Sequence, residues 1–273
     1  MIDSHHIDPN VIAQLPHAPG VYIFRGATAL PLYIGKSMNI RNRVLSHIRG
    51  DEKTRMVAQA RHVDHIETAG DIGAQLLEAR LIKEHKPLYN IRLRHVKKLY
   101  SIRLSPKVDH LFPSVVSSQD VTLGETDGLY GLFRSASAVR NKLEELAESH
   151  QLCHGLLGLE KIDKRGCFGF QINKCLGACA GHEDRKLHDD RLMAGVAELK
   201  IHIWPFDGAV DLVERREDWT QRHRIDQWRY LGTWCSRENR FNPCLEKGFD
   251  LDTYKILVKP IMFNPDENII ELG

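Results

Sequence analysis

Two short strand-like runs followed by a helix are the feature that most constrains the fold of this chain. Residues 20–24 and 32–35 alternate their side chains between two faces, and the segment between them is rich in turn residues. In each run a tyrosine, Tyr22 or Tyr33, lies on a face distinct from that of aliphatic neighbours. The pattern therefore predicts an antiparallel hairpin that leads directly into a helix.

The helix expected over residues 38–48, with Ser37 as its N-cap, has a charged side chain within its apolar stripe. Helical periodicity places Arg41 beside Val44, Leu45 and Ile48. A guanidinium group in an apolar stripe needs an anionic partner. The sequence therefore indicates an anion site at this helix.

A second helix, expected over residues 72–86, has a carboxylate in the middle of its apolar face. An ionised carboxylate there costs several kcal/mol unless a cation or a metal ion meets it. Two interpretations fit the spacing equally well, a structural ion pair, for example with Arg41, and a metal-binding site. The side chains on this face are Ala74, Leu77, Glu78, Leu81 and Ile82.

The hairpin residues resemble the signature of the GIY-YIG nucleases. Gly20–Tyr22 is followed after ten residues by Tyr33–Gly35, and Lys36 and Arg41 come next. The match continues downstream and is closest to the UvrC family of bacterial excinucleases, especially to its short members. The resemblance implies an α+β fold, in which a GIY-YIG domain has a small antiparallel sheet and flanking helices.

The same resemblance implies a metal-dependent endonuclease that hydrolyses one phosphodiester 3′ of a lesion in nucleotide excision repair. Glu78 would bind Mg²⁺ or Mn²⁺, and Tyr33 would take a proton from the attacking water with help from Tyr22. Asn90 matches the family's asparagine and is expected to position Glu78 or the water on the metal. The expected catalytic residues are Tyr22, Tyr33, Lys36, Arg41 and Asn90.

Two other functions remain open. One is a nuclease of the same class that cuts at a particular base sequence, like a restriction or homing enzyme. The other is a non-catalytic scaffold for DNA repair. The lack of a recognisable sequence-reading module weighs against the first, and the nearly complete set of catalytic residues weighs against the second.

The basic residues are concentrated in the part of the chain that contains the hairpin. Residues 1–100 have 15 Lys and Arg against 9 Asp and Glu, whereas the remainder has 23 against 27. A basic excess suits a phosphate backbone, although basic faces are often merely solvated. The candidate DNA-binding residues are Lys36, Arg43, Arg92, Arg94, Lys97 and Lys98.

Four of the six cysteines, Cys153, Cys167, Cys175 and Cys179, fall within 27 residues. Thiols grouped so closely indicate a metal site. Only one pair has the short spacing that structural zinc sites usually show twice, so iron–sulfur ligation fits somewhat better. The segment from Cys175 to Cys179 also resembles the CLGxC element of UvrC-type proteins, which implies a [4Fe–4S] cluster, with Zn²⁺ as the alternative.

The expected domain organisation has four parts. They are a nuclease domain over 11–98, connecting strands and a helix over 99–150, an iron–sulfur segment over 151–182 and a small mixed region over 183–273. Only 94 residues follow Cys179, too few for the further modules of full-length UvrC proteins. That length is why the short members of the family are the closer match.

The role of residues 183–273 stays open between a DNA contact and a UvrB contact. We expect a helix over 188–203 and strands over 254–260 and 268–272. Several aromatic and basic residues could form a nucleic-acid surface, although core tryptophans are the more common case. These residues are Trp219, Arg222, Arg224, Trp228 and Arg229.

The resemblance implies two partners, damaged double-stranded DNA and UvrB loaded by UvrA. The first ten residues contain acids and histidines rather than an apolar run, and no stretch approaches the length of a membrane span. We therefore expect a cytoplasmic protein with no membrane contact.

Overall fold

The computed structural model describes residues 6–28, 30–50, 54–90, 98–244, 248–263 and 268–272. The chain divides into two compact units. Unit 1 combines Met1–His95 with Pro205–Gly273, and unit 2 is Val96–Trp204. The sequence placed a boundary at residue 183, whereas the compact unit that precedes the C-terminal region extends to Trp204.

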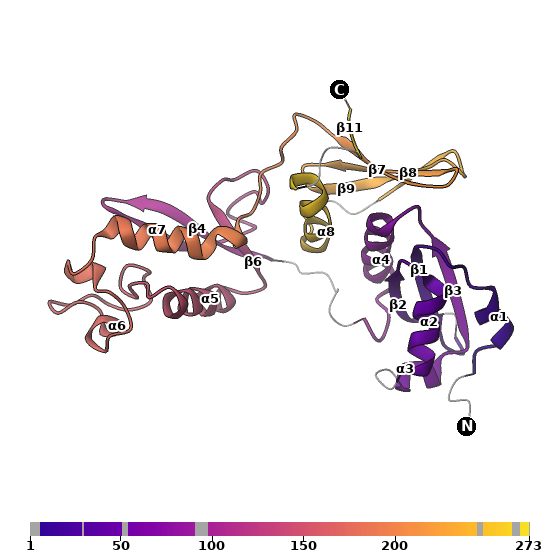
Figure 1. Cartoon of the computed structure of the whole chain (residues 1–273), viewed down its shortest axis with the longest axis horizontal. Coiled ribbons are helices and arrows are strands. Elements are labelled where there is room, and N and C mark those ends of the chain that lie inside the picture. Colours follow the sequence, from indigo (N-terminus) through magenta and orange to yellow (C-terminus); the bar gives the residue numbers. More distant parts are fainter. Residues whose placement is uncertain are drawn as a thin grey trace. The chain divides into compact units, whose positions relative to one another are not determined.

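The first part of unit 1 is a three-stranded antiparallel sheet with strand order β2-β1-β3 (Figure 1). The predicted hairpin is confirmed, and Tyr22 pairs with Gly35 across its two strands. The elements are α1 (Pro9–Gln14), β1 (Gly20–Arg25), β2 (Pro31–Ser37), α2 (Ile40–Arg49), α3 (Thr54–Gln59), β3 (His62–Glu67) and α4 (Asp71–His85).

The two faces of this sheet bury different kinds of side chain. Tyr22 and Phe24 pack with Ile40 and Val44 of α2 in one cluster. Val21, Ile23 and Ile34 pack with Leu81 and Ile82 of α4 in another. The alternation along β1 thus places the aromatic residues against α2 and the aliphatic residues against α4.

Helix α2 begins later than the sequence predicted. Its N-cap is Asn39, whose side chain accepts a hydrogen bond from the backbone N–H of Asn42 at 3.0 Å. The predicted cap, Ser37, instead bonds both backbone groups of Asn39 through its hydroxyl. The buried face of α2 consists of Ile40, Val44 and His47. The apolar stripe predicted through Arg41 is therefore rotated about the helix axis relative to the face that the helix buries.

The second part of unit 1 is a five-stranded sheet with order β10-β9-β8-β7-β11 and one helix. The strand predicted over 254–260 is wrong, because these residues lie in a helix that begins after Asp250 and buries Leu251, Tyr254, Leu257 and Ile261. The strand predicted over 268–272 is confirmed. The elements are β7 (Val210–Arg216), β8 (Trp219–Asp226), β9 (Arg229–Cys235), β10 (Arg240–Pro243), α8 (Leu251–Met262) and β11 (Ile269–Glu271).

Helix α8 packs against α4 and against β9, which joins the two parts of unit 1. The Lys83 ammonium group on α4 lies 2.6 Å from an oxygen of Asp250, at the start of α8. Trp204 in unit 2 and Trp219 and Trp228 in unit 1 are at most 6% exposed. For Trp219 and Trp228, the interpretation as core tryptophans is confirmed.

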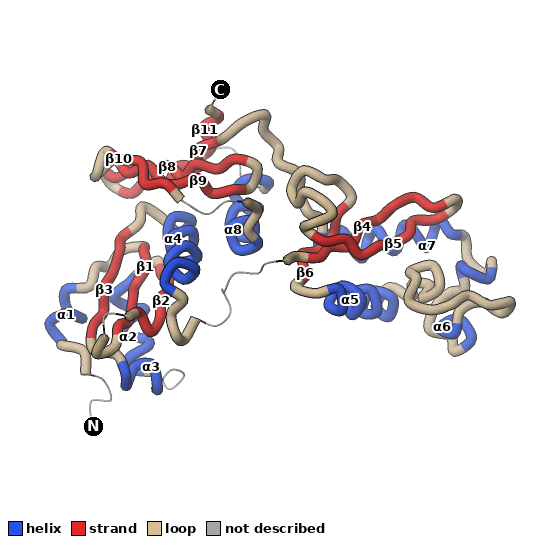
Figure 2. The backbone as a smooth tube through the Cα atoms, turned by 180° about the vertical axis from the view of Figure 1, so that it is seen from behind, coloured by secondary structure: helices blue, strands red, loops and turns tan. Residues whose placement is uncertain are grey.

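Unit 2 consists of a three-stranded sheet with order β5-β4-β6 and helices packed against it (Figure 2). Its core includes Ile102, Val139, Leu146 and Leu192. The connecting strands and the helix predicted over 99–150 are confirmed, whereas the helix predicted over 188–203 ends at Val196 and is followed by a 3-10 turn, Ala197–Leu199. The elements are β4 (Tyr100–Lys107), β5 (His110–Ser117), β6 (Leu129–Phe133), α5 (Ala136–Ser149), α6 (Phe168–Gln171) and α7 (Arg185–Val196).

Candidate active site

Three ring side chains meet where β1, β2 and α2 come together. Tyr22 is 1% exposed, and its hydroxyl lies 2.7 Å from Nε2 of His47. The Tyr33 ring packs against both, with centroids 6.1 Å from Tyr22 and 5.6 Å from His47. A Cβ atom on Gly35 would lie 2.3 Å from the Tyr22 hydroxyl, so only glycine fits opposite this tyrosine.

His47 is a site residue that the sequence analysis missed. It lies three residues after Val44 and seven after Ile40, on the buried face of α2. The phase of the apolar stripe could have revealed it, because a histidine on a buried helix face needs a polar partner. Tyr22 is that partner.

Arg43 is the arginine that the structure brings to Tyr22. Its side chain is exposed and lies close enough to the Tyr22 hydroxyl to lower the pKa of that group. Burial raises the pKa of Tyr22 and the neighbouring Tyr33 raises it further, while Arg43 opposes both without cancelling them. Arg41, the predicted anion-binding residue, lies two positions earlier and therefore on the opposite side of the helix.

Glu78 is held at the end of β2. Its Oε1 accepts a hydrogen bond from the backbone N–H of Lys36 at 3.0 Å. The Lys36 ammonium group in turn lies 2.8 Å from Oδ1 of Asp71 at the start of α4. Two carboxylates of α4 thus bind one residue of β2, and this contact fixes where the Glu78 carboxylate lies.

Asn90, which was predicted to position Glu78 or the water on the metal, contacts β2 in the structure. Its Oδ1 accepts from the Ile34 N–H at 2.9 Å, and its Nδ2 donates to the Ile34 carbonyl at 2.8 Å. The side chain is buried. Asn90 therefore makes the two hydrogen bonds with Ile34 that the backbone of a neighbouring strand would make. These bonds hold the β2 backbone in place two residues before Lys36.

The C-terminal sheet completes the first turn of α4. The N-cap of this helix is Gly70, which has no side chain to offer. Glu214 on β7 accepts from the backbone N–H of Ile72 at 2.9 Å and of Gly73 at 2.7 Å. Its Oε2 also lies 3.1 Å from Nε2 of His223. A side chain from β7 thus supplies the carboxylate that helix N-termini favour.

The predicted DNA-binding residues fall into three groups. Lys36 and Arg43 lie at the site described above. Arg92, Arg94 and Lys97 lie outside the described residues. Lys98 belongs to unit 2, where its ammonium group lies 5.3 Å from the centroid of the Tyr100 ring.

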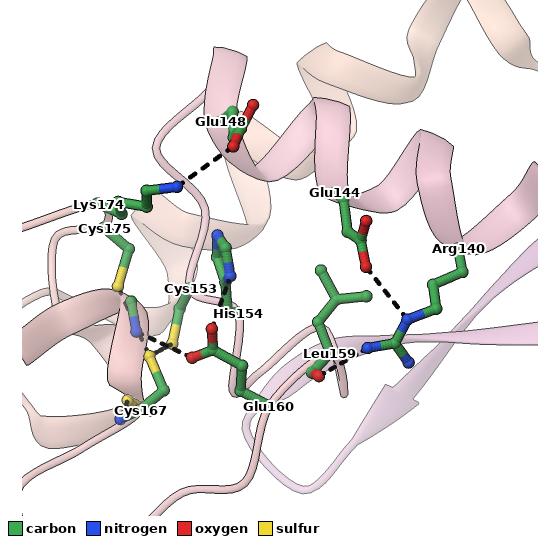
Figure 3. Close-up of polar contacts among 12 residues, drawn as sticks. Arg140, Glu144, Glu148, Cys153, His154, Leu159, Glu160, Cys167, Lys174 and Cys175 are labelled. Atoms are coloured by element: carbon green, nitrogen blue, oxygen red, sulfur yellow. Dashed lines mark hydrogen bonds and ion pairs between the residues drawn. The ribbon is translucent and has the colours of Figure 1, made fainter. Parts of the chain in front are cut away.

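A second candidate site lies in unit 2, where the predicted cysteines come together (Figure 3). The sulfur of Cys167 is 3.7 Å from that of Cys153 and 3.8 Å from that of Cys175. Cys153, Cys167 and Cys179 have their sulfurs within 4.8 Å of one another. The Cys167 backbone N–H donates to the Cys179 sulfur at 3.2 Å. All four predicted cysteines are therefore neighbours.

The polar groups beside the cysteines include His154, Glu160 and the backbone of Gly169, which form hydrogen bonds with one another. His154 Nδ1 lies 3.2 Å from Glu160, and the other oxygen of Glu160 accepts from the Gly169 N–H (Figure 3). Burial raises the pKa of the Cys175 and Cys179 thiols to about 12. A metal ion that binds here must displace their protons.

Three family models together match most of the chain. Residues 18–91 match a UvrC-like GIY-YIG domain, residues 99–198 a UvrC/Cho excinuclease middle domain, and residues 209–273 an excinuclease Cho C-terminal domain. Fold and site together define a GIY-YIG excinuclease of the UvrC type.

The most similar curated proteins show to which family within this class the chain belongs. Excinuclease Cho of Salmonella typhimurium is 45% identical over 98% of this chain and 90% of its own length, and that of Escherichia coli K12 is 44% identical over 91% and 84%. The chain belongs to the excinuclease Cho family. UvrABC system protein C of Moorella thermoacetica is 33% identical over 65% of this chain and 29% of its own length.

Among solved structures, the N-terminal GIY-YIG endonuclease domain of UvrC from Thermotoga maritima, bound to magnesium, is 37% identical. It covers 30% of this chain and 93% of that chain, with a TM-score of 0.29. In the described part of the chain, none of the helices is long and apolar enough to cross a membrane. The protein is an excision endonuclease of DNA repair.

Proposed function

We propose that this enzyme makes the incision 3′ of a lesion in double-stranded DNA, on a complex that UvrA and UvrB have assembled. The observation that carries the proposal is the grouping of Tyr22, His47 and Arg43 on the hairpin and α2, with Glu78 held at the end of β2. This grouping offers an anion site and a proton path on neighbouring elements. Kinship with the Cho excinucleases over 98% of the chain supports the repair assignment.

Glu78 is the residue that would hold a divalent cation. Its carboxylate is partly exposed and fixed by the Lys36 N–H, and one or two carboxylates with water and phosphate oxygens are the usual ligands of Mg²⁺. The chemistry of this donor fits Mg²⁺ or Mn²⁺. Such an ion would polarise the scissile phosphate and stabilise the leaving oxygen.

The proton of the attacking water would leave along the three rings. The Tyr33 ring packs against Tyr22 and His47, and Tyr22 is hydrogen-bonded to His47. Tyr33 would take the proton from water and pass its own to Tyr22, which would pass one to His47. An imidazole can hold a proton near neutral pH, whereas a phenol alone is a poor base there. Arg43 would bind the phosphate and stabilise its extra charge.

The four cysteines of unit 2 would hold a metal centre with a structural role. Four thiolates around one tetrahedral ion with bonds of about 2.3 Å lie about 3.8 Å apart, and two of the sulfur separations have this value. The resemblance to UvrC-type proteins implies a [4Fe–4S] cluster, in which each cysteine binds a different iron and the sulfurs lie further apart. Iron and zinc analysis with a visible absorption spectrum would decide between the two centres.

The test of the proposal uses a duplex with one bulky lesion, UvrA, UvrB and Mg²⁺. We expect a single nick 3′ of the lesion that requires UvrB and is lost in Glu78→Ala. Glu84→Ala is the matched control, because Glu84 lies on the same helix and pairs with Arg80 at the surface. Cutting that ignores the lesion and UvrB would keep the nuclease and refute the repair step. Cutting of an undamaged specific sequence, or binding without cutting, would favour the two other functions.

A further inference from the structure

The five-stranded sheet of unit 1 has one face that α4 and α8 do not use. Glu214, Gln221 and His223 point toward the start of α4. Glu214 accepts from two backbone N–H groups in the first turn of the helix, and Gln221 accepts from the N–H of Ala69, the residue before the N-cap. Because side chains alternate along a strand, the residues between them point to the opposite face. We call this opposite face the outer face. Its accessible central row runs across three strands through Arg222, Trp234 and Phe241, which are register partners, whereas Val213, the partner of Arg222 on β7, is buried.

Arginine and aromatic side chains stack on each other along this row. The Arg222 guanidinium lies 5.1 Å from the centroid of the Trp234 ring, and that of Arg224 lies 5.4 Å from the centroid of Phe241. Gly232 has φ +145°, and a Cβ atom there would lie 2.7 Å from the Phe241 ring. The glycine therefore allows Phe241 to lie flat over β9.

The outer face is positively charged. Its strands place two acids there, and each of them pairs with an arginine, Asp211 with Arg224 at 2.9 Å and Asp226 with Arg229 at 2.6 Å. Arg215 and Arg222 add two exposed charges. The face thus combines a positive excess with planar rings and planar guanidinium groups.

We propose that the outer face binds an unpaired DNA strand. Aromatic rings and guanidinium planes stack on bases, and free arginines neutralise phosphates. Only an unpaired strand exposes the faces of its bases, because in a duplex they are stacked on each other. The inference rests on the proposed function, since it assumes a DNA substrate, and it assigns this face a role in holding a strand that is separated near the lesion.

The test measures binding of the whole protein to fluorescein-labelled single-stranded oligonucleotides by anisotropy, in EDTA so that no cutting occurs. We expect Arg222→Ala to weaken binding about tenfold and to lower the salt dependence by about one counterion. Arg222→Lys keeps the charge but loses the planar stack, so its affinity should lie between those of the wild type and Arg222→Ala. Arg237→Ala is the matched control, because Arg237 stacks on Trp219 on the other face of the sheet.

Tryptophan fluorescence gives an independent readout. Trp204, Trp219 and Trp228 are buried, whereas Trp234 is partly exposed. Single-stranded DNA should therefore quench the wild type much more than Trp234→Phe. Thermal unfolding of each variant checks that it is folded, and Arg215→Ala, at an exposed position, provides a second charge deletion.

Three outcomes would overturn the inference. They are equal binding by wild type and the Arg222 and Arg215 variants, binding of duplex without binding of single strands, and loss of UvrB association by variants that bind DNA normally. The last would make the face a protein contact. If the wild type neither binds nor cuts DNA, the proposed function fails as well. That result can be distinguished from the three outcomes above, in which the wild type still binds DNA.

Discussion

The carboxylate of Glu214 accepts a hydrogen bond from the backbone N–H of Gly73 at 2.7 Å. The two residues are 141 positions apart, yet one caps the helix that contains the other. Glu78 lies on that helix one turn further on. The C-terminal sheet therefore helps to support the candidate active site, in addition to any contacts of its own.

We expect Glu214→Ala to weaken metal binding at a distance. Loss of the cap should lower the free energy of unfolding by about 1–2 kcal/mol and loosen the first turns of α4. The Mg²⁺ concentration for half-maximal cutting should rise several-fold, and excess Mg²⁺ should restore much of the rate. Glu217→Ala, in the exposed turn after β7, is the control. An unchanged Mg²⁺ dependence in a variant of lower stability would limit Glu214 to a structural role.

Asn90→Ala should act on the strand rather than on the metal. Both of its amide atoms bond Ile34, so its loss leaves two buried backbone groups of β2 unsatisfied, at a cost of about 1–3 kcal/mol for each. We expect a large loss of cutting with DNA binding in EDTA retained. Excess Mg²⁺ should give no rescue. Recovery at high Mg²⁺ would instead support the predicted role of Asn90 at the metal.

Arg43→Ala and Arg41→Ala should separate the two arginines of α2. Arg43 lies near the Tyr22 hydroxyl, whereas Arg41 lies on the other side of the helix. Removing a positive group that stabilises the transition state costs about 100-fold or more in rate. We expect that loss for Arg43→Ala and near-normal cutting for Arg41→Ala in single-turnover assays. The reverse result would restore the interpretation based on sequence alone.

The Lys83–Asp250 ion pair should make stability depend on pH in the acid range. Burial raises the pKa of Asp250, but the Lys83 ammonium and the Thr253 groups outweigh it, so the net pKa is lowered. A lowered pKa means that the unfolded state binds the proton more readily. The pair therefore stabilises the fold above about pH 4 and loses its effect as the pH falls further.

The matching variant is Lys83→Met, studied by urea unfolding at several pH values. Breaking a buried pair on one side costs about 3–5 kcal/mol near neutrality. The variant should also lose less stability than the wild type on acidification. Lys142→Met, which breaks a more exposed pair with Glu145, should change neither quantity appreciably. Parallel pH profiles for wild type and Lys83→Met would contradict the prediction.

Local patterns were sufficient for the hairpin and for α4. Alternation in β1 and β2 placed Tyr22 and Tyr33, and the apolar stripe of α4 singled out Glu78 because a carboxylate is out of place there. The phase of α2 was harder, because the apolar stripe predicted through Arg41 and Val44 shares only Val44 with the face that the helix buries, Ile40, Val44 and His47. His47 was missed for the same reason.

Contacts between distant residues could not be predicted from local patterns. Asn90 reaches Ile34 across 56 positions, and Glu214 reaches Ile72 across 142. The strand predicted over residues 254–260 failed because a short aliphatic run suits a strand and a buried helix equally. Tertiary packing against α4 and β9 decides in favour of the helix.

Unit 2 is inserted in the chain between the two parts of unit 1. A ribosome therefore makes the nuclease sheet and α4 first, then the whole unit with the cysteines, and only afterwards Glu214 and Asp250. Domains generally fold in the order in which they are synthesised. We expect the nascent chain to fold its cysteine-bearing unit before α4, the helix that contains Glu78, is capped. A partly made chain would then be a poor nuclease, and cutting would await the completion of translation.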